Sequence, residues 1–162
     1  MPSTNDAIVI SGATADMNFG STGDIGIVNT QGVQAESYIF FNINSIPPVD
    51  IDRATLSLWV ETANSPGNQT VCRVTGGWSE FGVTWNNRPG KSNPCYTALP
   101  FSFVDTYRGI VVTDIVQYWL DNGDNFGFNI SIALGEVSFT SRQGVLGTSS
   151  HAPKLFILYK QF

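Results

Sequence analysis

One stretch constrains the fold of this chain more than any other: residues 78–89, with the sequence Trp-Ser-Glu-Phe-Gly-Val-Thr-Trp-Asn-Asn-Arg-Pro. It carries two of the four tryptophans, and a packed indole buries roughly 200 Å² of surface. At about 25 cal/mol per Å², burying both rings stabilises a fold by several kcal/mol, so they must pack against a core. Glycine, asparagine and proline in the stretch favour sharp turns. We therefore interpret it as a loop that leaves a strand, closes one end of a β core with two indoles, and returns.

Glu80 lies between the two indoles, and its carboxylate can be buried there only if hydrogen-bond donors surround it. We therefore expect Glu80 to accept hydrogen bonds from loop amides near its own indoles rather than to act in catalysis. The residues expected to form this structural motif are Trp78, Glu80, Thr84, Trp85, Asn86 and Pro89.

Apolar and polar residues alternate along much of the remaining chain, which is the pattern of short strands with one buried face. The clearest case is residues 53–61, where Leu56 and Leu58 share the buried face and Trp59 points away from it. Further strands are expected at residues 7–10, 25–28, 38–43, 69–75, 101–104, 109–112, 126–134, 137–141 and 155–162, with Tyr159 facing inward.

One short helix is expected from Thr113, which can act as the N-cap, with Asp114 in the first turn and a stop at Gly123. Residues 91–99 contain a proline and are interpreted as irregular. Many short strands and little helix predict an all-β chain. We expect a jelly-roll-like antiparallel β-sandwich with one short helix, formed by a single domain over residues 1–162.

Charged residues make up only 13 % of the chain, about half the usual share. A surface with so few charges must be covered by uncharged polar side chains, as in many extracellular and virion β proteins. A net charge of −5 argues against nucleic acid as a partner, because a phosphate-binding face needs clustered Lys and Arg. No apolar run approaches the ~20 residues of a membrane span, so membrane insertion is not expected.

The two cysteines, Cys72 and Cys95, permit one disulfide. Cys72 lies in an alternating stretch on the same face as Val74, which favours a buried, reduced thiol. The alternative is a bridge that closes a loop of roughly 23 residues and stabilises the fold by about 3 kcal/mol.

The stretch at residues 78–89 resembles the signature of the DNRLRE domain family, a group of bacterial, archaeal and viral surface modules. Weaker matches follow in the family's order at residues 18–20, 39–47, 51–58, 112–119, 125–127, 139–142 and 152–155. The resemblance implies a non-catalytic, jelly-roll-like β-sandwich that attaches to surfaces or to carbohydrate, and in some members it implies calcium.

Catalytic machinery is not evident in the sequence. The only histidine, His151, lies in a Ser-Ser-His-Ala-Pro stretch, and no Gly-x-Ser-x-Gly elbow precedes a helix. A glycosidase needs two carboxylates about 5 to 9 Å apart, and Glu80 has no evident partner. We therefore expect that the protein is not an enzyme.

Calcium is the one cofactor that the sequence leaves open. Jelly-roll modules often bind an ion between loops through carboxylates and backbone carbonyls. The aspartates that lie in or near expected loops are Asp16, Asp24, Asp114, Asp121 and Asp124. They do not follow an EF-hand spacing.

Sugars bind to exposed aromatic rings with amide and hydroxyl neighbours. Alternation turns Trp59 away from the core, and it turns Tyr38 and Phe40 outward on residues 38–43. The candidates for glycan or partner contact are Trp59, Tyr38, Phe40, Tyr96 and Tyr107. The alternative is that a loop, the helix or a neighbouring subunit covers this outer face.

We interpret the chain as a surface-displayed binding or structural module for adhesion or glycan contact, such as a phage capsid decoration or tail-associated protein. The alternative is a carbohydrate-binding module of a bacterial or archaeal cell-surface protein or of a polysaccharide-degrading enzyme. The expected partners are a host or cell-surface glycan or neighbouring virion subunits, with a homo-oligomer left open. The expected location is a virion, the extracellular space or the cell surface.

Overall fold

The computed structural model of the protein describes residues 1–144 and 149–161. Within them the chain forms one α-helix, α1 (Thr113–Asn122), and short 3-10 helices at Gly12–Thr14 and Ser149–His151. The strands are β1 (Asn5–Ile10), β2 (Asp24–Thr30), β3 (Val33–Phe40), β4 (Ile51–Asn64), β5 (Gln69–Val74), β6 (Lys91–Ala98), β7 (Thr106–Val111), β8 (Phe128–Ile132), β9 (Gly135–Thr140) and β10 (Lys154–Tyr159).

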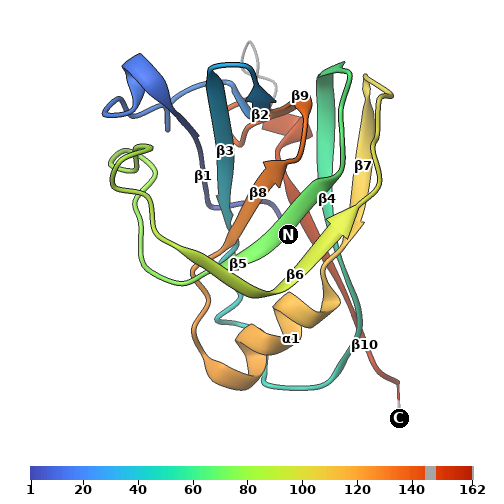
Figure 1. Cartoon of the computed structure of the whole chain (residues 1–162). Helices are drawn as coiled ribbons and strands as arrows, with labels where there is room; N and C mark the ends of the chain where they lie inside the picture. The colour runs from blue at the N-terminus through green and yellow to red at the C-terminus, as the bar shows by residue number, and fades with distance from the viewer. Residues whose placement is uncertain (145–148, 162) are drawn as a thin grey trace.

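The strands pair antiparallel and curl into two layers (Figure 1). One layer contains β1, β3, β8, β5 and β6 in hydrogen-bonded order. In the other layer, β4 pairs with β7 on one edge and with β10 and then β9 on the other, and β9 pairs with β2. A short ladder between β2 and β3 joins the layers. This is the all-β, jelly-roll-like antiparallel β-sandwich with one short helix that the sequence predicted.

The main core lies between the two layers. Leu56 and Leu58 on β4 are fully buried in it, whereas Trp59 is half-buried on the other face of the strand. This matches the period-two alternation, because successive side chains of a strand point to opposite faces. The helix closes one end of the core with the buried side chains of Ile115, Val116 and Trp119.

The end of α1 follows the sequence pattern, but its start does not. Gly123 adopts φ 74° in the left-handed region, where glycine avoids a steric penalty, and its N–H donates to the carbonyl of Trp119 at 2.8 Å. At the start, Val112 occupies the N-cap position and Thr113 is already helical. The Thr113 hydroxyl accepts a hydrogen bond from the N–H of Ala54 at 3.1 Å. Thr113 therefore ties the helix to β4 instead of capping it.

Strand β6 replaces the irregular segment that we expected at residues 91–99. β6 lies at the end of its layer and pairs with β5 alone. The ladder shifts register there: Cys72 lies opposite Cys95, and the next residue, Arg73, lies opposite Ser92. Pro94 falls in the resulting bulge, after a cis peptide bond, so its missing N–H leaves no ladder partner unpaired.

Two other expectations for strands are corrected. Residues 101–104 form no strand, and they connect β6 to β7 with Phe103 71 % exposed. Tyr159 was expected to face inward, but it is 48 % exposed. A register shift between Leu158 and Tyr159 interrupts the alternation at that point.

Cys72 and Cys95 form a disulfide between β5 and β6. The expected reduced thiol is therefore wrong. Alternation correctly buries Cys72, which is 5 % exposed, but it cannot show which residue of the returning strand lies opposite. The bridge spans 23 residues, and by restricting the unfolded chain it stabilises the fold by about 3 kcal/mol.

Candidate functional site

A second apolar cluster lies on the outer face of the β1–β3–β8–β5 layer, and residues 78–89, which we call the indole loop, cover it (Figure 1). Its buried members come from β1, β3, β5 and the loop itself: Ala7, Val9, Tyr38, Val74 and Val83. The partly buried rings of Trp78, Trp85 and Phe126 pack over them.

Trp78 and Tyr38 form the centre of this cover. Their rings pack edge to face with centroids 5.7 Å apart. The Trp78 Nε1–H donates to the carbonyl of Phe126 at 2.9 Å, and the Tyr38 hydroxyl donates to the carbonyl of Pro89 at 3.0 Å. Alternation correctly turned Tyr38 away from the main core. The indole loop covers Tyr38 and leaves it only 1 % exposed, so the alternative of a covered outer face applies to this residue.

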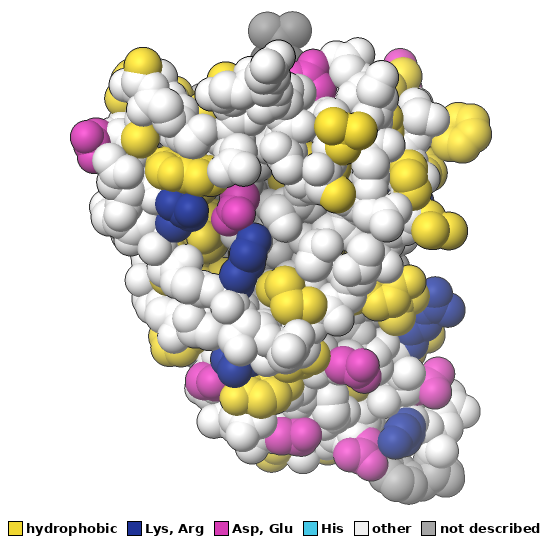
Figure 2. Space-filling model, viewed as in Figure 1, with side chains coloured by type: hydrophobic (Ala, Val, Ile, Leu, Met, Phe, Trp, Pro, Cys, Tyr) yellow, Lys and Arg dark blue, Asp and Glu magenta, His cyan; other side chains and the backbone are white. Residues whose placement is uncertain are grey.

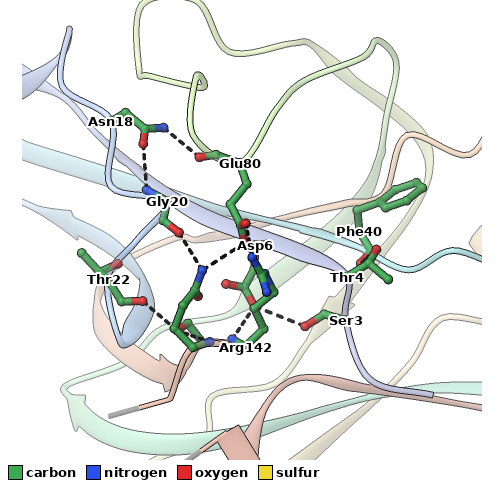
Figure 3. A network of polar contacts seen from close by, with 11 residues as sticks. Ser3, Thr4, Asp6, Asn18, Gly20, Thr22, Phe40, Glu80 and Arg142 are labelled. Carbon is green, nitrogen blue, oxygen red and sulfur yellow. Dashed lines mark hydrogen bonds and ion pairs between the residues drawn. The ribbon is translucent and has the colours of Figure 1, made fainter. Parts of the chain in front are cut away.

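Glu80 anchors the indole loop to two distant segments and is 2 % exposed (Figure 3). Its Oε1 accepts hydrogen bonds from the N–H of Asp6 at 3.0 Å and from Gln143 Nε2 at 3.2 Å. The Arg142 guanidinium binds both carboxylate oxygens. Burial alone would raise the pKa of Glu80, but Arg142 and these amides outweigh it and hold the pKa below its usual value. The donors therefore come from β1 and from the segment after β9 rather than from Glu80's own loop.

Asp6 is the second buried carboxyl of this network and is 1 % exposed. Its Oδ2 accepts hydrogen bonds from the N–H of Arg142 at 2.7 Å and from the Ser3 hydroxyl at 3.2 Å. Its Oδ1 has no hydrogen-bond partner among the described residues. Burial raises the pKa of Asp6 to about 6; the Arg142 N–H opposes this rise, and the nearby Glu80 charge adds to it.

Three further contacts hold the second half of the indole loop. The Thr84 hydroxyl accepts a hydrogen bond from a backbone N–H within the loop at 3.3 Å. The Asn86 side chain donates to Asp16 Oδ1 at 2.7 Å. The Arg88 guanidinium lies over the Trp85 ring, 3.7 Å from its centroid. The Thr84 and Arg88 contacts lie within the loop, whereas the Asn86 contact ties it to the segment between β1 and β2.

Two Asn-Phe-Gly turns, which begin at Asn18 and Asn125, have the same hydrogen-bond pattern. In each turn the asparagine Oδ1 accepts from the N–H of the glycine, at 3.1 and 2.9 Å. In each, the asparagine Nδ2 donates to a distant carbonyl at 2.8 Å, that of Glu80 in the first turn and of Phe41 in the second. Gly20 cannot be replaced freely, because a Cβ there would lie 1.9 Å from the Glu80 carbonyl oxygen. The motif is therefore a local device that docks a turn onto a neighbouring segment.

The second turn borders a hollow of about 240 Å³ at the edge of the indole loop, which we call the aromatic hollow. Three partly exposed rings from different segments line it, and uncharged polar or glycine residues complete its wall. The lining residues are Phe40, Trp78 and Phe126, with Asn5, Gly77 and Asn125. Asn5 and Phe40 are opposite each other in the β1–β3 ladder. The fold thus brings the sequence-derived glycan candidate Phe40 next to two further rings.

Trp59 lies on the other outer face, away from the core. The His151 ring stacks on it, with centroids 3.8 Å apart and planes 10° apart, and the Tyr107 ring packs against it edge to face at 5.1 Å. The Lys154 Nζ donates to the Tyr107 hydroxyl at 3.1 Å. One face of Trp59 is therefore occupied by the short segment that carries His151.

Tyr96 is the remaining glycan candidate. It is 44 % exposed on β6 and lines a separate hollow of about 150 Å³ with residues 111–115. None of the described residues that line this hollow adds a second aromatic ring to Tyr96. The five candidates thus do not form one site: Trp59 and Tyr107 contact each other, Tyr96 lies apart, and Phe40 alone among the five lines the aromatic hollow.

The five candidate calcium ligands do not converge. Asp16 bonds to Asn86, Asp121 accepts from Gln117, and Asp124 pairs with Arg73. Asp24 begins β2, and Asp114 lies in the first turn of α1. Within residues 1–144 and 149–161, no three His, Cys, Asp or Glu side chains are grouped so that they could hold a metal ion. Within the described residues, these five aspartates therefore do not share one ion site.

Sequence reasoning missed Asn5, Gly77, Asn125 and Phe126 as lining residues, and it assigned Trp78 to structure alone. A signal was present for the second turn, because its Asn-Phe-Gly sequence repeats that of residues 18–20. The sequence carries no comparable signal for Asn5, because its position depends on the ladder between β1 and β3.

Comparison with protein-family sequence models places this chain in a family. None of the curated proteins compared with the chain matches it. The sequence model described as carbohydrate-binding module family 96 matches residues 1–159, nearly the whole chain. The chain therefore belongs to carbohydrate-binding module family 96.

Proposed function

We propose that this chain is a non-catalytic module that binds a glycan in the aromatic hollow. One observation carries the proposal: three partly exposed rings, Phe40, Trp78 and Phe126, line a single hollow on a chain that belongs to a carbohydrate-binding family. The family supports this carbohydrate-binding alternative over a virion role.

The lining suits a sugar for physical reasons. The C–H faces of a pyranose are apolar and pack on aromatic rings, while its hydroxyls need donors and acceptors at the rim. The side-chain amide of Asn5 has no hydrogen-bond partner among the described residues, so it can serve a ligand hydroxyl. Trp78 is held by its own hydrogen bond to Phe126, so the platform is ordered before a ligand arrives.

The positions of the carboxyl groups favour binding without catalysis. Carbohydrate-binding modules are generally non-catalytic. Glu80 and Asp6 lie close to each other, but they are 2 % and 1 % exposed and Arg142 binds both. A glycosidase needs its two carboxyl groups on either side of a bound sugar. The pair here holds the indole loop instead.

The family also indicates where the module works. A carbohydrate-binding module suggests an extracellular or cell-surface location with glycan as partner. None of the described helices could span a membrane. We include in the proposal that residues 1–162 act as one domain, and that the resemblance to DNRLRE surface modules reflects the same task of attachment.

The proposal is tested by replacing a ring of the hollow that does not hold the indole loop. Phe40→Ala should lower glycan affinity about tenfold, close to 1.4 kcal/mol, because one stacking surface is lost. The matched control is Phe103→Ala, which removes a ring that is 71 % exposed outside the hollow and should leave affinity unchanged. Binding is measured on a glycan array and then by calorimetry on the best ligand, with thermal melting to confirm folding.

Trp59→Ala distinguishes the hollow from the other outer face. If Trp59→Ala abolishes binding and Phe40→Ala does not, the glycan binds beside Tyr107 and the proposed location is wrong. If no glycan binds the unmodified chain, the proposed function itself fails.

A further inference from the structure

Three polar side chains from different strands meet on the outer face of the layer that contains β3, β8, β5 and β6. The Lys91 Nζ donates hydrogen bonds to Asn129 Oδ1 at 2.9 Å and to Glu36 Oε1 at 3.0 Å. The Asn129 Nδ2 donates to the other oxygen of that carboxylate, Glu36 Oε2, at 2.8 Å. Each side chain therefore contacts the other two, and an amine, a carboxamide and a carboxylate form a closed triangle.

Strand order and register bring these three groups together. Glu36 lies on β3, Asn129 lies on the neighbouring strand β8, and Lys91 is the first residue of β6. Strand β5 lies between β8 and β6, with Cys72 opposite Asn129 (Figure 1). The Lys91 side chain must therefore cross β5 to reach Asn129, and the contact joins two strands that are not neighbours in the sheet.

The burial of the triangle favours a reaction between its members. Asn129 is fully buried, whereas the Glu36 side chain is 17 % exposed and the Lys91 side chain is 34 % exposed. The carboxamide is therefore shielded from water, and the partly exposed side of the triangle gives a small leaving molecule a path to solvent. Groups held in contact and well oriented react as if each were present at roughly 10⁵ M or more.

Glu36 contacts both nitrogens that such a reaction involves, one with each carboxylate oxygen. It can take a proton from an attacking amine and give a proton to a leaving amine, which is general acid–base catalysis. A further charged group at Glu36 is Arg88, whose Nε lies 3.9 Å from Oε2. This distance is longer than either hydrogen bond to Glu36, so Arg88 favours the charged carboxylate without replacing Lys91 or Asn129.

We propose that Lys91 and Asn129 form an intramolecular amide cross-link, with Glu36 as the catalytic residue. The Lys91 ammonium transfers a proton to Glu36, and the lone pair of Nζ then attacks Asn129 Cγ. The bond between Cγ and Nδ2 breaks, while the new bond between Nζ and Cγ remains. Glu36 passes the two protons that leave Nζ to Nδ2, so the departing group is ammonium. Atoms and charges balance, no oxidant or reductant is consumed, and Glu36 ends as a carboxylate.

The cross-link holds a strand at the end of its layer. Strand β6 pairs with β5 alone, and the Cys72–Cys95 disulfide already links these two strands. A bond between Lys91 and Asn129 adds a link from β6 to β8, and unlike a disulfide it is not broken by reducing agents. The inference is separate from glycan binding, since none of the three reacting residues lines the aromatic hollow.

Mass spectrometry of the intact chain tests the proposal directly. The reaction releases ammonia, so the unsubstituted chain, after reduction of its disulfide, should weigh about 17 Da less than its sequence predicts. Trypsin should then fail to cleave after Lys91, and residues 74–108 should appear joined to residues 109–142 in one peptide. The cysteines are reduced and alkylated first, so that the disulfide joins no peptides.

Two variants each remove one reacting group and keep its hydrogen-bonding capacity. Lys91→Arg keeps a cation beside Glu36, but a guanidinium stays protonated and cannot attack Cγ. Glu36→Gln keeps the shape of the side chain but cannot carry protons. Both variants should show their full calculated masses. Lys160→Arg is the matched control, because Lys160 is an exposed lysine paired with Asp50, and this variant should lose ammonia as the unsubstituted chain does. Thermal melting confirms that each variant is folded.

The possible outcomes decide the proposal. A full calculated mass for the folded, unsubstituted chain, with normal cleavage after Lys91, would overturn the cross-link and leave only a hydrogen-bonded triangle. Loss of ammonia from Lys91→Arg would show that other side chains react, which also overturns it. A cross-link that forms equally well in Glu36→Gln would overturn the role assigned to Glu36.

Discussion

The two outer faces of the sandwich each carry a tryptophan, and they cover it by different means. On the β1–β3 layer, Trp78 belongs to the indole loop, whose Glu80 is buried and bound by Arg142. On the β4 layer, Trp59 is covered by a single stacked ring, that of His151. Both tryptophans are partly buried, but the first face forms a buried apolar cluster of its own, whereas Trp59 belongs to neither buried cluster of the described residues.

The difference shows what is needed to turn a solvent-facing sheet surface into a second core. A loop that crosses the sheet must bury its own backbone polar groups, so it needs fixed hydrogen-bond partners. Glu80 supplies an anchor to β1 and to the segment after β9. The edge of such a loop leaves some rings partly exposed, and the aromatic hollow lies at that edge. Uncharged surface predominates in Figure 2, and several acidic and basic side chains lie next to each other there.

Removing Glu80, the anchor of the indole loop, should cause the largest loss of stability and so tests the comparison most strongly. Glu80→Ala leaves Arg142 without its carboxylate partner and the Asp6 N–H without an acceptor. Breaking a fully buried ion pair by removing one partner costs about 3–5 kcal/mol. The Arg142 side chain is 34 % exposed, so we expect a loss in the free energy of unfolding at the lower end of this range, about 3 kcal/mol. Urea denaturation measures it. The control Arg53→Ala removes an exposed charge, and a similar loss there would refute the special role of Glu80.

A smaller change in the free energy of unfolding is expected from Asp6, and this change depends on pH. The native pKa of Asp6 is about 6, against 3.8 when unperturbed, so between these values the unfolded chain releases a proton that the native chain keeps. The Asp6 contribution to stability is therefore greatest below pH 4 and is lost as the pH rises to 6. Two units correspond to about 3 kcal/mol at most.

Asp6→Asn should remove this loss, because an amide oxygen can still accept from Ser3 and Arg142. Unfolding free energies at pH 4, 5, 6 and 7 should fall for the unmodified chain relative to the variant. Parallel pH profiles for the two proteins would show that Asp6 does not titrate in this window. Glu80 acts in the opposite direction, because its lowered pKa contributes stability that is lost as the pH falls below about 4.5.

The smallest loss of stability is expected on the outer face that carries Trp59. His151→Ala removes one stacked ring from Trp59, and an aromatic pair contributes about 0.5–1.5 kcal/mol beyond its burial. We expect a loss of about 1 kcal/mol, measured by urea denaturation, together with a red shift in tryptophan fluorescence as Trp59 gains solvent. A loss as large as that of Glu80→Ala would mean that the two faces are covered equally firmly.

Alternation explains why much of the fold was predictable. The inward faces of residues 53–61 and 128–132 follow a period of two, which depends on backbone geometry alone. The expected alternation at 126–134 fails at its ends, because Phe126 packs on the outer cluster and Leu134 is 63 % exposed. The helix was predictable because Gly123 ends it and its apolar residues share one face. β6 was not, because a bulge at Pro94 breaks the alternation that reveals strands.

The candidate site was predictable only in part. Alternation predicts that Tyr38 and Phe40 both point outward, since they lie two residues apart on one face of β3. It therefore cannot distinguish between them as candidates for glycan contact. The indole loop then buries Tyr38 and leaves Phe40 at the edge of the hollow. Which of these two positions stays exposed depends on where the indole loop crosses the sheet. That loop lies roughly 40 residues further along the chain, so no local pattern near β3 reveals its path.

By itself, the sequence determined the class of fold, the end of the helix and the packing of two indoles by one loop. These depend on local periodicity, turn residues and the size of apolar side chains. The expected position of that loop at one end of the core is wrong, because it covers the outer face of one layer and its indoles stay partly buried. The tertiary structure alone decided the Cys72–Cys95 bridge, the partners of Glu80 and the meeting of Phe40 with Trp78 and Phe126. Each of these joins segments that are far apart in the chain, and strand order and register, which no local pattern encodes, bring them together.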